Sequence, residues 1–115
     1  MNYAYNRILF TISVLLFTAS CLGADETPLL VFEIHFAAHG FLPLHLAIPA
    51  GKRVRLKVVN SSPERIEFES FKLNREKVVG PGETVIVDLP PLKAGTYDFF
   101  DDFHADVPEG EIVAQ

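Results

Sequence analysis

The chain of 115 residues is long enough for one small globular domain and too short for two. Hydrophobic residues make up 49% of it and charged residues 22%, which excludes an unfolded or low-complexity chain. The formal net charge of -5 gives the chain no overall positive charge to attract nucleic acid, and an anionic membrane surface is an equally poor partner.

The first 24 residues have the features of a secretory signal peptide. Arg7 supplies a short positive region, and residues 8–19 form an apolar run that is shorter than a membrane-spanning helix. Small residues follow, so we expect cleavage near Ala24. The sequence therefore predicts a signal peptide at residues 1–24 and an exported domain at residues 25–115, in the periplasm or secreted.

Cysteine and methionine each occur once, at Cys21 and Met1, and both lie inside the predicted signal peptide. A competing interpretation makes Cys21 the acylated first residue of a lipoprotein, but Thr18 stands where such signals usually have Leu. Once the signal is removed, the domain has neither thiolate nor thioether. Disulfides, iron–sulfur clusters, thiol redox chemistry and cysteine-type zinc sites are then excluded.

The exported part shows the alternation of apolar and polar residues that is typical of β-strands. The clearest case is residues 53–58, where three apolar residues alternate with three basic ones before the turn-forming segment 60–63. Turns that contain glycine or proline separate such segments at short spacing. We expect about seven strands, near residues 30–36, 44–48, 53–59, 65–69, 84–89, 97–99 and 112–114.

This pattern predicts an all-β fold, an antiparallel Greek-key β-sandwich. Residues 70–79 fit either one helical turn or an irregular strand, and their spacing does not decide between the two. No convincing long helix occurs elsewhere in the sequence, and no repeat or linker divides residues 25–115. A single domain is therefore expected.

Three segments resemble segments of the cupredoxin-like family. The first runs from an F-x-P loop at residues 41–43 to a P-x-G-x-x-V turn at residues 49–54. The second is the strand end at residues 59–60 with the proline-containing loop that follows. The third, residues 95–110, is similar to the family's G-x-Y-x-F-x-C-x-x-H ligand loop. The resemblance covers nearly all of the exported part and implies the cupredoxin-like sandwich.

The departures from the family pattern concern its metal ligands. In blue-copper members two His, one Cys and a weak axial Met hold the ion, and the centre depends on the copper–thiolate bond. Here Asp101 occupies the Cys position and Glu64 lies where the first His is expected, so only His104 remains. We therefore expect no blue-copper centre.

A closer resemblance is to the cupredoxin-like domains of periplasmic iron-uptake systems of the EfeO type. Those domains contain E-W-E, R-E, P-G and G-E-Y-D segments. This chain has similar segments at residues 67–69, 75–76, 81–82 and 95–98. Phe41 and Asp101 replace the cysteines of that family, so any site carried over must use oxygen and imidazole donors.

The resemblance implies metal ligands on the loop and on the strands beside it. Asp101 and His104 lie at the family's metal position, although their acidic segment can also be interpreted as a solvated loop anchored by Phe residues. Glu67 and Glu69 share one face of a strand, and Glu67 is the favoured ligand of the two. His39 lies close before the F-x-P loop; with His104 and a carboxylate it gives the donor composition of a non-heme iron site.

We therefore expect an exported cupredoxin-like protein that binds a transition metal, iron ahead of copper, for delivery to an inner-membrane metal permease. The alternative is a metal-free β-sandwich that binds a periplasmic protein partner. Every candidate ligand can also be surface charge, and Glu76 would then pair with Arg75 or Lys77. The sequence lacks a nucleophile elbow and a phosphate-binding glycine loop, so an enzyme is less expected and no small-molecule substrate is evident.

Overall fold

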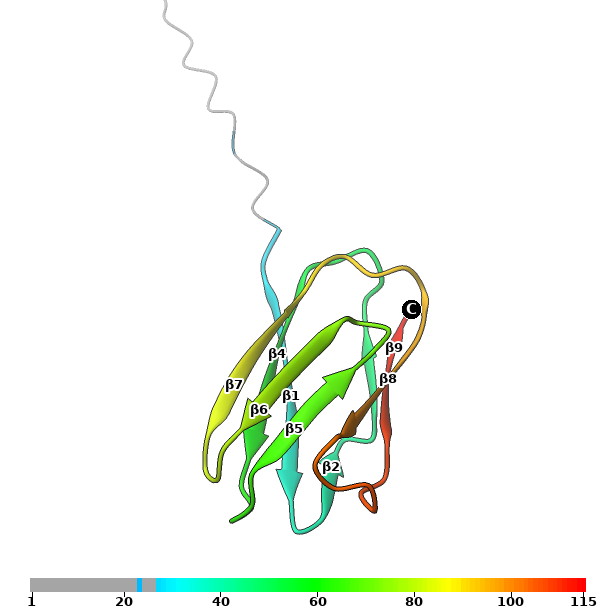
Figure 1. The fold of residues 1–115 in the computed structure, drawn as a ribbon. Coiled ribbons are helices and arrows are strands. Elements are labelled where there is room, and N and C mark those ends of the chain that lie inside the picture. Colours follow the sequence, from blue (N-terminus) through cyan, green and yellow to red (C-terminus); the bar gives the residue numbers. More distant parts are fainter. Residues whose placement is uncertain (1–22, 24–26) are drawn as a thin grey trace, which may run out of the picture.

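The computed structural model describes Gly23 and residues 27–115 (Figure 1). The predicted signal peptide, with Cys21, lies outside the described residues apart from Gly23. In the described part of the chain, no helix has the length and apolar character needed to cross a membrane.

Residues 27–115 form nine β-strands. These are β1 (Leu30–Ala37), β2 (Gly40–Leu42), β3 (His45–Ile48), β4 (Val54–Asn60), β5 (Ile66–Ser70), β6 (Arg75–Val79), β7 (Thr84–Leu89), β8 (Gly95–Asp101) and β9 (Gly110–Ala114). They build a four-stranded sheet in the order β2-β1-β4-β7 and a five-stranded sheet in the order β3-β9-β8-β5-β6. The predicted all-β sandwich is confirmed.

The structure differs from the expectation in strand number and direction. The two strands that the sequence analysis did not count are β2, which lies in the F-x-P loop, and β6, which lies in the ambiguous segment 70–79. β1 pairs with β4 and β3 pairs with β9 in parallel, whereas the other strand pairs of residues 27–115 are antiparallel. Alternation reveals the faces of a strand but not its direction relative to its neighbours, so it did not predict the parallel pairs.

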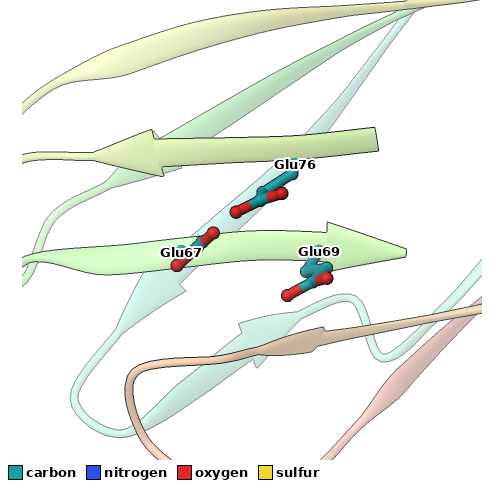
Figure 2. Close-up of side chains that lie close together, drawn as sticks. All are labelled: Glu67, Glu69 and Glu76. Carbon is teal, nitrogen blue, oxygen red and sulfur yellow. The ribbon is translucent and has the colours of Figure 1, made fainter. Parts of the chain in front are cut away.

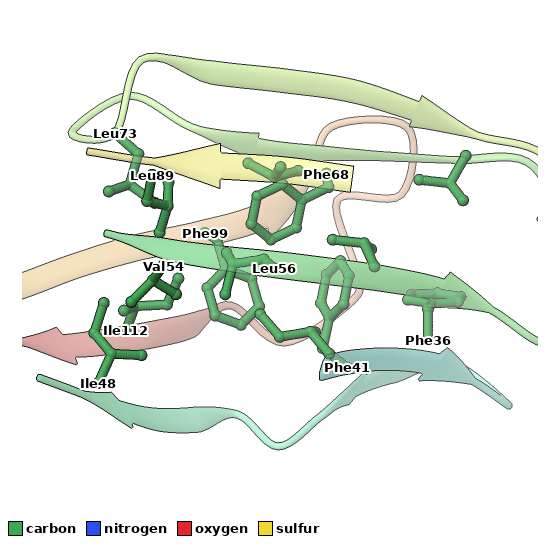
Figure 3. Close-up of a cluster of buried hydrophobic side chains, with 14 of the residues drawn as sticks. Phe36, Phe41, Ile48, Val54, Leu56, Phe68, Leu73, Leu89, Phe99 and Ile112 are labelled. Carbon is green, nitrogen blue, oxygen red and sulfur yellow. The ribbon is translucent and has the colours of Figure 1, made fainter. Parts of the chain in front are cut away.

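The hydrophobic core lies between the two sheets. Alternate residues of β4 are buried, as the pattern of residues 53–58 predicted. Four phenylalanine rings, those of Phe36, Phe41, Phe68 and Phe99, pack at the centre with neighbouring centroids 5.1 to 6.2 Å apart (Figure 3). Phe68 belongs to β5 and Phe99 to β8, so these rings define which face of each strand is the inner one.

The pairing of β5 with β8 consequently places the acidic residues on two different faces of the sheet. Phe68 is the pairing partner of Asp101, and Glu69 is the partner of Phe100. Residues directly opposite each other in a sheet share a face, so Asp101 lies on the inner face with Phe68. Glu69 lies on the outer face, and Glu67, two residues before it, lies there too.

Candidate metal site

Three glutamates gather on the outer face of β5 and β6 (Figure 2). Glu67 and Glu69 come from β5, and Glu76 comes from β6, where it pairs with Glu69. One carboxylate oxygen of each lies within 4.8 Å of one oxygen of each of the other two. Among the described residues, this is the one group of three or more His, Cys, Asp or Glu donors that lie so close together. We term these three residues the glutamate cluster.

The glutamate cluster combines burial with like charge. Glu67 is only 5% exposed, whereas Glu69 is half-buried and Glu76 is exposed. A hydrogen bond with Glu76, then burial, then the negative charges of Glu76, Asp102 and Glu69 raise the pKa of Glu67 to about 7. Burial, followed by the charges of Asp102 and Glu76, also raises the pKa of Glu69. Protonation of Glu67 therefore reduces the repulsion within the cluster, and a bound cation would have the same effect.

No ion pair among residues 27–115 joins a glutamate of the cluster to a lysine or an arginine. Arg75 lies on the opposite face of β6, where its guanidinium donates to the backbone carbonyl of Asp88 at 3.1 Å. Lys72 lies 3.4 Å from a carboxylate oxygen of Asp98. The alternative in which Glu76 pairs with Arg75 or Lys77 is not supported, because no ion pair in residues 27–115 joins Glu76 to either one.

Asp101 occupies the inner face, and both of its oxygens have partners. Its side chain has no exposed surface. Oδ1 accepts hydrogen bonds from the backbone N–H groups of Glu67 at 2.9 Å and Phe103 at 3.0 Å. Oδ2 lies 2.6 Å from Nδ1 of His104. These contacts account for a buried carboxylate at this position without any metal ion.

His104 connects Asp101 to a second acid. Its Nε2 lies 3.1 Å from Oε2 of Glu64, so each ring nitrogen faces a carboxylate. The hydrogen bond with Asp101 is the main cause that raises the pKa of His104, and the charges of Asp101 and Glu64 act in the same direction against burial. We term Asp101, His104 and Glu64 the Asp–His–Glu chain.

His39 belongs to neither group. It is exposed in the turn between β1 and β2 and borders, with Glu64, a hollow of about 210 Å³. The structure therefore divides the five predicted ligands. Asp101 and His104 contact each other, Glu67 and Glu69 lie together on the other face of the sheet, and His39 joins neither pair. Their role as metal ligands stays a prediction.

Two residues of these groups were not among the ligands predicted from sequence. Glu76 completes the glutamate cluster because β5 and β6 form a hairpin that places it opposite Glu69. A sequence signal for the turn between these strands is Asn74, a residue type that tolerates positive φ, and its φ in the structure is 51°. Glu64 stands where the resemblance has a His, and it is the second partner of His104.

The position where blue-copper proteins hold their ion does not suit a type 1 copper ion in this chain. Residues 25–115 contain no Cys or Met, so the required thiolate is missing. Both nitrogens of His104 already face carboxylates, and among the described residues no buried side-chain nitrogen or oxygen lacks a hydrogen-bond partner. A copper ion at this position would have to displace contacts of His104.

A comparison with protein families and with curated proteins extends these observations. A family model described as "Cupredoxin-like domain" matches residues 8–114. An uncharacterized protein of Rickettsia prowazekii (strain Madrid E) is 35% identical over 107 residues, which cover 91% of this chain and 86% of that protein.

Solved structures of copper proteins share the fold. The metal-binding domain of the Streptococcus pneumoniae D39 Cu(I)-exporting P-type ATPase CopA, solved with Cu(I), has a TM-score of 0.68 at 16% identity, covering 78% of this chain and 89% of that chain. Auracyanin A, a "blue" copper protein from Chloroflexus aurantiacus, has a TM-score of 0.63 at 16% identity, covering 76% and 100%. At this identity the likeness shows the fold alone. Because the family model matches almost the whole chain, the protein belongs to the cupredoxin-like domain family.

Proposed function

We propose that the protein binds a metal ion through the glutamate cluster and serves metal acquisition, with iron ahead of copper. The observation that supports this is the placement of Glu67, which is almost fully buried while its carboxylate lies against those of Glu69 and Glu76. Burying a carboxylate beside two others costs free energy unless a proton or a cation neutralises the group.

The donor set favours a hard ion. Three carboxylates supply only oxygen, which suits ions such as Fe³⁺ or Mn²⁺, whereas Cu(I) prefers the sulfur donors that residues 25–115 lack. Glu69 and Glu76 are more exposed than Glu67, so one side of the cluster is open to solvent. An ion bound there can enter and leave without unfolding the sheet, as a delivery protein requires.

The proposal extends to a place of action outside the cytoplasm and to delivery to an inner-membrane metal permease, as in the EfeO-type systems that the sequence resembles. The support is that the two segments of that resemblance at residues 67–69 and 75–76 contribute all three glutamates of the cluster. The signal-like residues 1–24 support export.

Calorimetric titration of the purified protein with Mn²⁺, Cu²⁺ and, without oxygen, Fe²⁺ tests this function. We expect a single bound ion, held about tenfold more weakly or worse after Glu67→Gln or Glu76→Gln because each removes one charged ligand. Glu33→Gln is the matched control, since it removes an exposed carboxylate from the four-stranded sheet. Absence of binding by the parent, or equal losses in Glu67→Gln and Glu33→Gln, would contradict the proposal.

Recognition of a protein partner without metal is the second candidate function, and two aromatic rings favour it. Phe71 is 77% exposed, and its ring centroid lies 5.2 Å from that of Phe100 on the outer face of β8. Exposed aromatic residues are typical of recognition surfaces. Phe71→Ser should weaken capture of such a partner and leave the calorimetric titration unchanged, which separates this function from metal binding.

A further inference from the structure

The regular pairing of β5 with β8 ends one residue before it would include Glu67. The paired residues are Phe68 with Asp101 and Glu69 with Phe100. The backbone of Glu67 is held by other groups. Its N–H donates to Oδ1 of Asp101 at 2.9 Å, and its carbonyl accepts from the N–H of Asp102 at 3.1 Å. The carboxylate of Asp101 therefore replaces a regular strand-to-strand hydrogen bond at Glu67, the most buried residue of the glutamate cluster.

We propose that Asp101, braced by His104, is a positioning residue for Glu67 and is not itself a metal ligand. This inference rests on the proposed function of the glutamate cluster. The two acids lie on opposite faces of the sheet, and the link between them is the backbone N–H of Glu67. Fixing that N–H fixes the direction in which the Glu67 side chain leaves β5, and hence the position of its carboxylate beside Glu69 and Glu76.

Asp101 can serve this purpose because it is itself fixed. Its side chain is fully buried, and Oδ1 also accepts from the N–H of Phe103. Oδ2 is held by His104, whose other nitrogen faces Glu64. A carboxylate with every oxygen engaged keeps one orientation and offers little to an ion. Supporting groups of this kind, which orient a metal ligand without touching the metal, typically change metal affinity by about 10- to 100-fold when they are removed.

The position that the resemblance aligns with the family's copper site therefore has a different role in this chain. Asp101 stands where blue-copper relatives have their Cys, yet its oxygens are directed to backbone N–H groups and an imidazole. Asp101 thus acts as a clamp that holds the N–H of Glu67 from the inner face, supported by His104 and Glu64, and the ion would bind on the outer face.

Two substitutions of Asp101 test the clamp through the affinity for Mn²⁺ at the glutamate cluster. Asp101→Asn keeps an oxygen for the two backbone N–H groups, and Asp101→Ala removes it. We expect Asp101→Ala to bind Mn²⁺ about tenfold more weakly than the parent, and Asp101→Asn to stay within about threefold. If Asp101→Ala binds as tightly as the parent, or if Asp101→Asn loses as much as Asp101→Ala, the inference is overturned.

A loss of general stability has to be separated from a loss of positioning. Val58→Ala opens a cavity in β4 of the other sheet and leaves every contact of Glu67 in place, so it should destabilise the fold without changing Mn²⁺ affinity. Where Asp101→Ala does not fold, His104→Ala replaces it, because it removes the brace and retains Asp101. We expect His104→Ala to bind Mn²⁺ more weakly than Glu33→Gln, and equal affinities would overturn the inference.

Amide hydrogen exchange keeps the two proposals distinguishable. The N–H of Glu67 should exchange slowly in the parent and in Asp101→Asn, and faster in Asp101→Ala, with or without an added ion. If the parent binds no metal ion while this exchange pattern holds, the proposed function fails and the clamp on Glu67 stands. If exchange of the Glu67 N–H is unchanged in Asp101→Ala, the clamp itself is refuted.

Discussion

The acidic residues on the two faces of the five-stranded sheet have different partners. On the inner face, each oxygen of Asp101 has a backbone N–H or an imidazole as its partner. On the outer face, the carboxylates of Glu67, Glu69 and Glu76 lie against one another. An acid at the position that the resemblance aligns with the family's metal ligand is therefore not automatically available to an ion. What matters is whether its oxygens are still free to bind an ion.

The largest expected effect comes from packing on the inner face. A Cβ on Gly110 would lie 2.2 Å from Cζ of Phe99, whose ring is fully buried. Gly110→Ala should therefore lower the free energy of unfolding by about 3 kcal/mol, measured by urea denaturation. Gly40→Ala is the control, because a Cβ there meets nothing within 4 Å. Equal stabilities of the two variants would contradict the close packing.

Removal of the inner carboxylate should have the next largest effect. Asp101→Ala leaves two backbone N–H groups and the His104 imidazole without a partner, and we expect a loss of about 2 kcal/mol in urea denaturation. Asp98→Ala is the matched control on the outer face of β8, where its contact with Lys72 is a surface pair. A loss in Asp98→Ala as large as that in Asp101→Ala would remove the contrast between the faces.

Removal of a carboxylate from the outer face should raise the stability of the fold slightly. Glu67→Gln keeps the shape of the side chain and removes the charge that faces Glu69 and Glu76. In the presence of a chelator at alkaline pH, we expect a small rise in Tm. A drop in Tm like that expected for Asp101→Ala would show that Glu67 is a satisfied structural acid instead.

The raised pKa values of Glu67 and His104 make the stability of the fold depend on pH. The pKa of Glu67 is raised from 4.5 to about 7. Its contribution to the free energy of unfolding is therefore complete below pH 4.5 and is lost as the pH rises through about 7. The pKa of His104 is raised from 6.5, so its contribution is complete below 6.5 and is lost as the pH rises through the folded value. Both groups lower the free energy of unfolding as the pH increases.

Urea denaturation across this range gives the measurement. Glu67→Gln should reduce the fall in the free energy of unfolding that begins above pH 4.5, and His104→Gln should reduce the fall above pH 6.5. A free energy of unfolding that rises from pH 4.5 to 7 in the parent and loses this rise in Glu67→Gln would have the wrong sign for a raised pKa.

Alternation predicted the sandwich because half-buried strands reveal their faces, most clearly at residues 53–58. For the same reason it placed Glu67 and Glu69 together. Alternation does not identify the inner face of β8, since Phe99 and Phe100 are adjacent and both apolar. The pairing of Phe68 with Asp101 and the burial of the Asp101 side chain show that Asp101 lies inside.

Glu76 illustrates a different limit. Its place beside Glu69 depends on a hairpin whose turn includes Asn74 at positive φ. The spacing of residues 70–79 does not reveal that turn, because a helical turn fits the same pattern. A ligand contributed by the neighbouring strand is therefore found only when strand register is known.

Anomalous diffraction from crystals of the protein loaded with Mn²⁺ or Fe³⁺ would locate the ion itself and so show which face of the sheet binds it. We expect one peak on the outer face of β5, within bonding distance of the carboxylates of Glu67, Glu69 and Glu76. A peak beside His104 and Asp101, with no density at the glutamate cluster, would contradict the account.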